Sequence, residues 1–238
     1  MDGGDAGWVA AMDGCIGSLR DILNERRTLP LKESTDIIGD MLDGLAYAYD
    51  QDQVLHLDLK PENVLYNLDV GRLKRVSTES KDILHTSRFM ISDWGIASIK
   101  QPRLNEIAGL PPTSAAAQRT FNNMGTLLYM APERFTEGFS SSIASDVFSL
   151  GMIYVEMLTG SLPFRAEIHP VQSLLSSQYL LDVRRLLQSA QAPAPVVSLI
   201  SSMIAFSPND RPRDYSALRT SIIRAYRRST GLLSRIFN

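Results

Sequence analysis

The sequence predicts a mainly helical α+β fold, a helical bundle that carries a few short strands. A chain of 238 residues, 44% of them hydrophobic, is long enough to bury a real core. Apolar residues recur at helical spacing in three segments, which are 34–50, 145–160 and 214–233. Strand signals are few and short, and they lie at 7–12, 63–68 and 88–93.

The first predicted elements are the strand at 7–12 and the helix at 34–50. Ser34 or Thr35 can cap this helix, because a side-chain oxygen at that position accepts a hydrogen bond from a free amide of the first turn. The apolar face of the helix consists of Ile38, Met41, Leu42, Leu45 and Tyr49. We therefore expect one buried and one exposed face.

The middle of the chain combines two short strands with irregular segments. The strands at 63–68 and 88–93 are separated by a polar, charged insertion at about 69–87. The segment 100–123 contains three prolines and many small residues, so we expect a mobile loop there.

The two later helices differ in character. The helix at 145–160 is apolar on nearly every side, which places it in the middle of the domain, and Gly160 stands where a C-cap is expected. The helix at 214–233 is amphipathic, and it belongs to a basic C-terminal stretch. Residues 211–238 hold seven arginines and one aspartate, a charge of +6 within a chain of net charge −2. This basic helix either contacts an acidic partner or membrane surface or is an ordinary solvated face.

Composition limits the cellular context. A single cysteine, Cys15, excludes an internal disulfide, and the acidic N-terminus does not look like a secretory signal. No apolar run approaches the roughly 18 residues that a membrane span needs. We expect a cytoplasmic or other reducing intracellular location, and no nucleic-acid partner.

The stretch HLDLKPEN, residues 56–63, carries the residue types that phosphoryl transfer needs. Pro61 favours a loop here, in which several polar side chains can converge on one point. Asp58 can accept a hydroxyl proton, Lys60 supplies positive charge, and Asn63 offers a neutral oxygen ligand for Mg²⁺. Asp93, in SDWG at the end of a strand, can hold the same metal. Each residue taken alone also fits a structural role in a turn.

Five motifs in order resemble the eukaryotic-type serine/threonine protein kinase family. HLDLKPEN resembles its catalytic loop, DWG its magnesium motif, and GTLLYMAPE the end of its activation segment. SDVFSLG resembles the start of its central helix, and NDRP its late arginine–proline motif. The resemblance covers the chain from about Val9 to about Tyr226, and it implies the large, C-terminal lobe of the kinase fold.

The resemblance assigns roles residue by residue. It implies Asp58 and Lys60 as catalytic residues, and Asn63 and Asp93 as ligands of Mg²⁺. It places Gly14 at the hinge and Leu65 beneath the adenine of ATP. It also implies a stack of His56 with Trp94 and an ion pair of Glu133 with Arg211. Asp146 would brace the catalytic loop. Lys60 together with Thr126 resembles the serine/threonine branch.

The sequence departs from the family at its start. The glycines before His56 do not form the glycine-rich loop, and no lysine precedes Lys32. We therefore expect the small lobe to be absent, with residues 1–16 as a hinge-like remnant and 17–238 as the large lobe. An exposed apolar face near Trp8 and Val9 should then bind a protein partner or a second copy.

A second departure is Leu57, which stands where the family usually has arginine. That arginine ordinarily pairs with a phosphate on the activation loop, and leucine cannot replace it. We therefore expect no control by phosphorylation at Thr113, Ser114 or Thr120.

Two functions remain open. The first is an enzyme, a Mg-ATP-dependent serine/threonine protein kinase or its catalytic half, acting on a protein hydroxyl. The second is a pseudokinase-like scaffold that docks a partner through the face left open by the small lobe. The complete set of four polar site residues favours the enzyme, and the absent lobe favours the scaffold.

Overall fold

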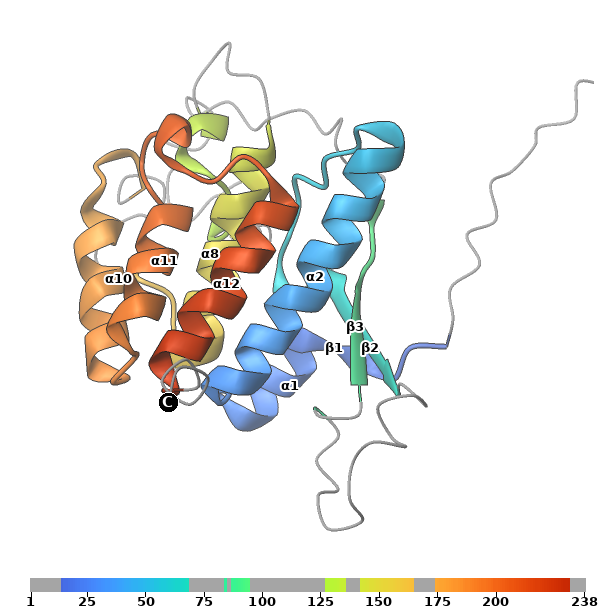
Figure 1. Cartoon of the computed structure of the whole chain (residues 1–238), viewed down its shortest axis with the longest axis horizontal. Coiled ribbons are helices and arrows are strands. Elements are labelled where there is room, and N and C mark those ends of the chain that lie inside the picture. The colour runs from blue at the N-terminus through green and yellow to red at the C-terminus, as the bar shows by residue number, and fades with distance from the viewer. Residues whose placement is uncertain are drawn as a thin grey trace, which may run out of the picture.

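The computed structural model describes residues 14–68, 84, 87–94, 127–135, 142–164 and 174–231 (Figure 1). The α-helices are α1 (Leu19–Arg26), α2 (Leu31–Asp52), α8 (Ile143–Thr159), α10 (Gln178–Ser189), α11 (Ala194–Met203) and α12 (Tyr215–Ser229). The strands are β1 (Gly17–Ser18), β2 (Val64–Leu68) and β3 (Ser87–Ile91), and the 3₁₀ helices are η1 (Pro61–Asn63), η3 (Pro132–Phe135) and η4 (Pro208–Asp210). The expected mainly helical architecture is therefore confirmed. The expected strand at 7–12, most of the insertion at 69–87 and the loop at 100–123 lie outside the described residues.

The sheet is small and antiparallel, with strand order β1-β2-β3. Tyr66 of β2 lies opposite both Gly17 of β1 and Phe89 of β3, which fixes the register across the sheet. The sheet lies at one side of the helical body, and α2 packs directly against β3 (Figure 1). The strands predicted at 63–68 and 88–93 are confirmed as β2 and β3.

Helix α8 occupies the centre of the body, as its sequence predicts. Every residue from Ala144 to Met157 is buried, because α2, α10 and α11 pack around it. Gly160 ends the helix in the left-handed conformation, with a φ of 70°, which a glycine adopts without steric cost. The predicted C-cap is therefore confirmed.

Helix α2 begins earlier than predicted. Its N-cap is Pro30, and the Ser34 amide already donates to the Pro30 carbonyl at 3.0 Å, so the expected cap at Ser34 or Thr35 is wrong. Both side chains are buried inside the helix instead, and the Thr35 hydroxyl bonds the Tyr154 hydroxyl of α8 at 2.8 Å. The hydrogen bond from α2 to α8 explains why the polar residue Thr35 lies inside the helix rather than at its N-cap.

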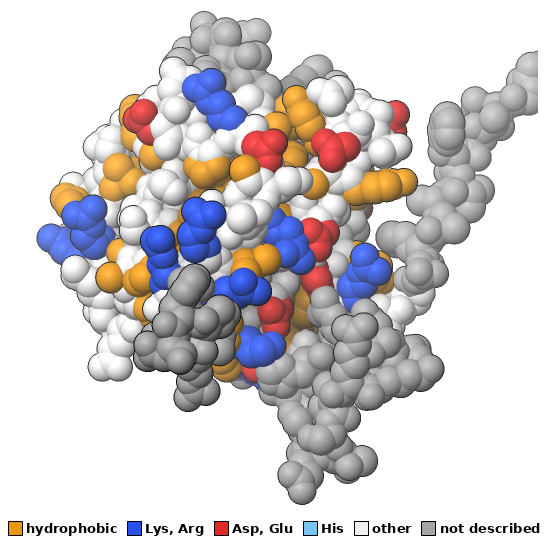
Figure 2. Space-filling model, viewed as in Figure 1, with side chains coloured by type: hydrophobic (Ala, Val, Ile, Leu, Met, Phe, Trp, Pro, Cys, Tyr) orange, Lys and Arg blue, Asp and Glu red, His pale blue; other side chains and the backbone are white. Residues whose placement is uncertain are grey.

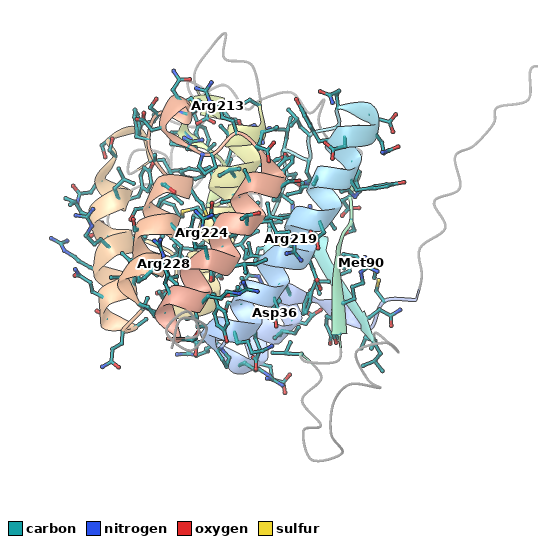
Figure 3. The ribbon with its side chains drawn as sticks, in the orientation of Figure 1. Asp36, Met90, Arg213, Arg219, Arg224 and Arg228 are labelled. Atoms are coloured by element: carbon teal, nitrogen blue, oxygen red, sulfur yellow. The ribbon has the colours of Figure 1, made fainter. Side chains whose placement is uncertain are left out.

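Helix α12 lies along α2 and α11, with its N-terminus capped by Asp214, whose carboxylate accepts from the Ala217 amide at 2.6 Å. Leu218 and Ile222 face the core, which confirms the amphipathic pattern. Basic side chains gather over this helix on the surface shown in Figure 2, where Arg219, Arg224 and Arg228 follow its length (Figure 3). Arg219 forms an ion pair with Asp43 of α2.

No helix in the described part of the chain is long and apolar enough to cross a membrane.

Candidate active site

The segment 56–63 forms a loop between α2 and β2, as Pro61 predicts. Helix α2 ends at Gln53, in the left-handed conformation, and η1 starts at Pro61, whose missing amide is not needed at the first position of a helix. The loop is well packed, because the side chains of His56, Pro61 and Asn63 are all buried. Polar groups are thus held in place by a short rigid turn rather than by an exposed loop.

Asp58 is the centre of this loop. The Nζ of Lys60 lies 3.1 Å from the Asp58 carboxylate. The side-chain amide of Asn63 donates to the Asp58 carbonyl at 2.9 Å and to its carboxylate at 3.2 Å. Three of the predicted site residues therefore form one hydrogen-bonded cluster.

Asp93 is brought to this cluster by its neighbour Ser92. The amide and the hydroxyl of Ser92 both donate to the Asn63 carbonyl, at 2.9 and 3.2 Å. Asp93 follows directly, exposed and with a φ of 60°, a conformation that is uncommon for an aspartate and marks a tight turn. The two loops that the sequence analysis selected therefore lie against each other.

His56 and Trp94 complete this junction. The Nε2 of His56 bonds the Ser92 carbonyl at 2.8 Å, and the two rings meet edge to face with their centroids 5.1 Å apart, which confirms the predicted stack. The indole Nε1 of Trp94 donates to the Ile91 carbonyl at 2.9 Å. A phenylalanine at position 94 would lack this bond, so the larger ring adds a polar anchor to the end of β3.

Asp146 of α8 holds the backbone of the loop at 56–63. Its carboxylate accepts from the amides of His56 and Leu57, at 2.9 and 2.7 Å, which confirms the predicted brace. The Tyr215 hydroxyl of α12 donates to the same carboxylate at 2.9 Å, a contact that sequence reasoning missed. Complete burial raises the pKa of Asp146, and these three hydrogen bonds act in the opposite direction.

Glu133 and Arg211 form the predicted ion pair. Two bonds of 2.8 and 2.9 Å join the carboxylate and the guanidinium, and both side chains are buried. Arg211 also donates to three backbone carbonyls and lies over the ring of Phe148, 4.8 Å from its centroid. The pair holds η3 against the segment that follows α11.

Comparison with known proteins identifies the arrangement. Residues 9–223 match the family described as the protein kinase domain. The chain belongs to the protein kinase family. It is 29% identical to mitogen-activated protein kinase kinase 1 of Arabidopsis thaliana, over 95% of this chain and 56% of that protein. It is 30% identical to the probable serine/threonine-protein kinase pknA2 of Bifidobacterium longum, over 84% of this chain and 22% of that protein.

The kinase chain spans about half the length of the plant relative, and a smaller part of the bacterial one. A second plant relative, mitogen-activated protein kinase kinase SIPKK of Nicotiana tabacum, is 33% identical over 64% of this chain and 34% of that protein. The similarity to the protein kinase family extends beyond the site, because the matched residues 9–223 include all the described helices except the end of α12.

The other two predicted site residues are Leu65 and Gly14. Leu65 is on β2, opposite Ser18 of β1 and Met90 of β3, beside the segment that follows the expected hinge. Gly14 is exposed, and a side-chain carbon placed on it would meet nothing within 4 Å.

Asn63 and Asp93 carry the types of oxygen that would hold a magnesium ion together with phosphate oxygens. Asn63 uses its amide nitrogen on Asp58, and its Oδ1 has no hydrogen-bond partner in the part of the chain that the structure describes. Within the same residues, no group of three or more acidic, histidine or cysteine side chains forms a metal site. Mg²⁺ commonly takes one or two protein oxygens and completes its shell with phosphate and water. The Oδ1 of Asn63 and the carboxylate of Asp93 would supply these two protein oxygens.

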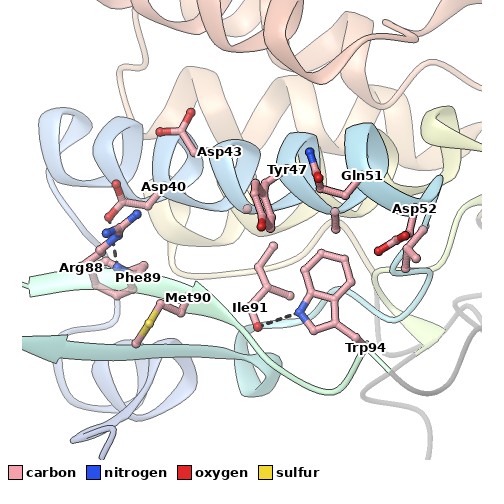
Figure 4. Close-up of a pocket in the computed structure, with 13 residues that line it drawn as sticks. Asp40, Asp43, Tyr47, Gln51, Asp52, Arg88, Phe89, Met90, Ile91 and Trp94 are labelled. Carbon is pink, nitrogen blue, oxygen red and sulfur yellow. Dashed lines mark hydrogen bonds between the residues drawn. The ribbon is translucent and has the colours of Figure 1, made fainter. Parts of the chain in front are cut away.

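A groove of about 810 Å³ borders the site without including it. It runs between α2 and β3, and Trp94 is the residue that it shares with the catalytic junction (Figure 4). On the α2 side, the groove is lined by Gly44, which as a glycine has no side chain, and by Tyr47, which is 70% exposed. The predicted site residues therefore lie beside this groove and not inside it, because Asp58, Asn63 and Asp93 do not line it.

Sequence reasoning missed two arginines that touch the catalytic loop. Arg20 of α1 bonds Glu62 at 2.8 Å and Glu156 of α8 at 2.8 Å, and so ties η1 to two helices. Arg134 of η3 donates from Nη1 to the Leu57 carbonyl. Arg134 directly follows the APE motif, and its position there was the available signal.

Proposed function

We propose that this protein is the catalytic large lobe of a serine/threonine protein kinase that transfers the γ-phosphate of Mg-ATP to a protein hydroxyl. The observation that carries this proposal is the position of Asn63. Its side-chain amide holds Asp58, its backbone carbonyl holds Ser92 beside Asp93, and its Oδ1 stays free for a cation. A single residue thus joins the two loops that the reaction requires.

Each group then has a defined role. Asp58 orients the substrate hydroxyl and accepts its proton, because its carboxylate is half-buried and held by Asn63. Lys60, 3.1 Å from Asp58, turns its charge toward the transferred phosphate when the nucleotide is present. Asn63 and Asp93 would hold Mg²⁺, which neutralises charge on the phosphates.

The substrate class follows from the relatives only as a proposal. Several of them are named as kinases of mitogen-activated protein kinases, so protein kinases belong among the substrates to be tested. A generic basic protein is the neutral starting point, because the name of a relative does not fix the specificity of this chain.

A binding module is the second candidate, and the groove between α2 and β3 favours it. We propose that its occupant is a small lobe of the protein-kinase type. The groove ends at Val54 and Trp94, next to the catalytic junction, and the 238 residues hold no glycine-rich loop that would cover a nucleotide. A lobe placed there would be held beside the catalytic junction, and binding it would require no phosphoryl transfer by this chain.

Transfer of labelled phosphate tests the proposed function. Purified protein is incubated with Mg²⁺ and γ-labelled ATP in the presence of a basic protein substrate. We expect slow labelling that is abolished by Asp58→Asn and by Asp93→Ala. Asp36→Ala removes an exposed carboxylate paired with Lys32 and serves as the matched control, with labelling unchanged.

Two results would contradict the kinase proposal. Labelling that survives Asp93→Ala would come from a contaminating enzyme. No labelling, together with a melting temperature that ATP and Mg²⁺ leave unmoved, would favour the binding module instead.

A further inference from the structure

Leu57 has a backbone conformation that its surroundings must hold in place. Its φ is 63°, in the left-handed region, which costs a residue other than glycine about 1–3 kcal/mol. It is buried, and it directly precedes Asp58. Any relaxation of Leu57 toward ordinary backbone angles would therefore turn the peptide that carries the proposed catalytic aspartate.

The two sides of Leu57 are held by opposite charges. Its amide donates to the buried carboxylate of Asp146 at 2.7 Å, and its carbonyl accepts from the Arg134 guanidinium. The amide of Asp58 donates to His56 Nδ1 at 3.2 Å. The peptide between Leu57 and Asp58 is thus fixed at both its carbonyl and its amide, and the charge-assisted bond comes from Arg134.

Arg134 lies among carboxylates that already have other partners. Burial lowers its pKa, while the charges of Asp146, Asp58 and Glu133 act to raise it. Glu133 is paired with Arg211, and Lys60 lies beside Asp58. Arg134 forms no ion pair within 4 Å in the described part of the chain, so its direct polar contact is with the loop backbone.

The fit of Arg134 argues against a purely structural role. Its Nε is buried and has no hydrogen-bond partner among the described residues. A buried unpaired donor on a charged group is unfavourable, and an apolar side chain of similar length often replaces such a group at little cost. Stability alone would therefore not select an arginine at this position.

We propose that Arg134 is the positioning residue of Asp58. From η3 its guanidinium bonds the Leu57 carbonyl, and through this bond it sets the orientation of the catalytic loop. No phosphate is needed for this contact, because both partners are unmodified residues. The inference deepens the proposed kinase function and rests on it for its effect on catalysis.

This contact links the catalytic loop directly to η3, the segment that also carries the buried ion pair. Glu133 and Arg134 are neighbours in η3, and they reach in different directions, one to Arg211 and the other to the catalytic loop. The end of the APE motif therefore sets the position of Asp58 from a segment that the buried ion pair anchors.

Three variants separate positioning from simple support of the fold. Arg134→Met removes the charge and the donors but keeps the length of the side chain. Arg134→Lys keeps a charged donor that reaches a carbonyl. Arg224→Met is the control, because Arg224 is an exposed arginine of α12 with no ion pair among the described residues.

For Arg134→Met we expect a melting temperature within about 4 °C of wild type. Hydrogen exchange at the Leu57 and Asp58 amides should be faster by about tenfold, with exchange in α8 and α12 unchanged. The kcat for phosphoryl transfer should fall by about tenfold to a hundredfold, with the KM for ATP within about twofold, because a misplaced group slows the chemical step. Arg134→Lys should recover most of the kcat.

Two outcomes would overturn the proposal. In one, exchange at Leu57 and Asp58 in Arg134→Met equals that in Arg224→Met. In the other, exchange rises equally in every helix while the melting temperature falls, which is the behaviour of a residue that only supports the fold. If the wild-type protein transfers no phosphate, the proposed function fails, and local exchange still decides the role of Arg134.

Discussion

Arg211 is a charged residue that water does not reach. Its side chain is fully buried, and that of Glu133 is 5% exposed. A buried charge is tolerated only when its partners replace water, and here a carboxylate, three carbonyls and an aromatic ring do so. The intact pair therefore stabilises the fold more than a single one of its two side chains would in the absence of the other.

Removing one half of this pair should destabilise the protein strongly. We expect Glu133→Gln and Arg211→Met each to lower the free energy of unfolding by about 3–5 kcal/mol, because an uncompensated charge or buried donor remains. Urea unfolding monitored by circular dichroism measures this change, and the double variant should lose less than the sum of the two.

The exposed pair of Lys32 with Asp36 is the matched control for that experiment. Its side chains are 55% and 52% exposed, so Lys32→Met should change stability by less than about 1 kcal/mol. Equal effects at the two pairs would show that the burial of Arg211 does not matter.

Residue types and their order identified the polar residues around Asp58 but not the residues that support them. Asp58, Lys60, Asn63 and Asp93 lie in short motifs whose composition already indicates phosphate chemistry. Tyr215 and Arg134, in contrast, reach the site only because α12 and η3 pack beside it. For Arg134 the sequence offers only its position after the APE motif, and for Tyr215 it offers no local pattern, since both contacts depend on tertiary structure.

At the scale of elements, Gly151 of α8 makes a close contact between helices. A side-chain carbon added there would lie 2.5 Å from Ile204 Cγ2 and 3.1 Å from Met203 Cβ, at the end of α11. Real carbon atoms do not approach to 2.5 Å, so the glycine sets how closely the two helices pack. Gly44 of α2 has space by comparison, with Ile91 Cδ1 at 3.9 Å.

The two glycines should respond to alanine with opposite signs. Gly151→Ala should destabilise the protein by about 1–3 kcal/mol, because α11 must move away from α8. Gly44→Ala should stabilise it by up to about 1 kcal/mol, since alanine favours helix and meets only an ordinary contact. Thermal and urea unfolding of both variants measure the difference, and a stabilising Gly151→Ala would contradict this packing.

Periodicity predicted the long elements, and its failures have physical causes. Helix α8 is recognisable because it is apolar on all sides, whereas α2 starts three residues before its predicted cap, because Pro30 can begin a helix without a capping side chain. Helices α10 and α11 were not predicted. They are short, and α11 starts in the APAP segment, where Pro193 is its N-cap and Pro195 lies in its first turn.

At the scale of the whole molecule, the site is assembled by elements that are distant in sequence. Asp146 from α8 and Arg134 from η3 bond the backbone of the loop that follows α2, and Tyr215 from α12 bonds Asp146. Asn63 then joins this loop to the end of β3. The helical body therefore holds the backbone of this loop through a few buried polar contacts.

The account depends on Asn63 and Asp93 holding one metal–nucleotide complex, and binding of Mn²⁺ with a non-hydrolysable ATP analogue tests this most directly. Mn²⁺ replaces Mg²⁺ at oxygen ligands, and electron paramagnetic resonance counts the free ion. We expect nucleotide-dependent Mn²⁺ binding that Asp93→Ala weakens by at least about tenfold, or about 1.4 kcal/mol, while Asp36→Ala leaves it unchanged. Equal binding in wild type and Asp93→Ala would contradict the account.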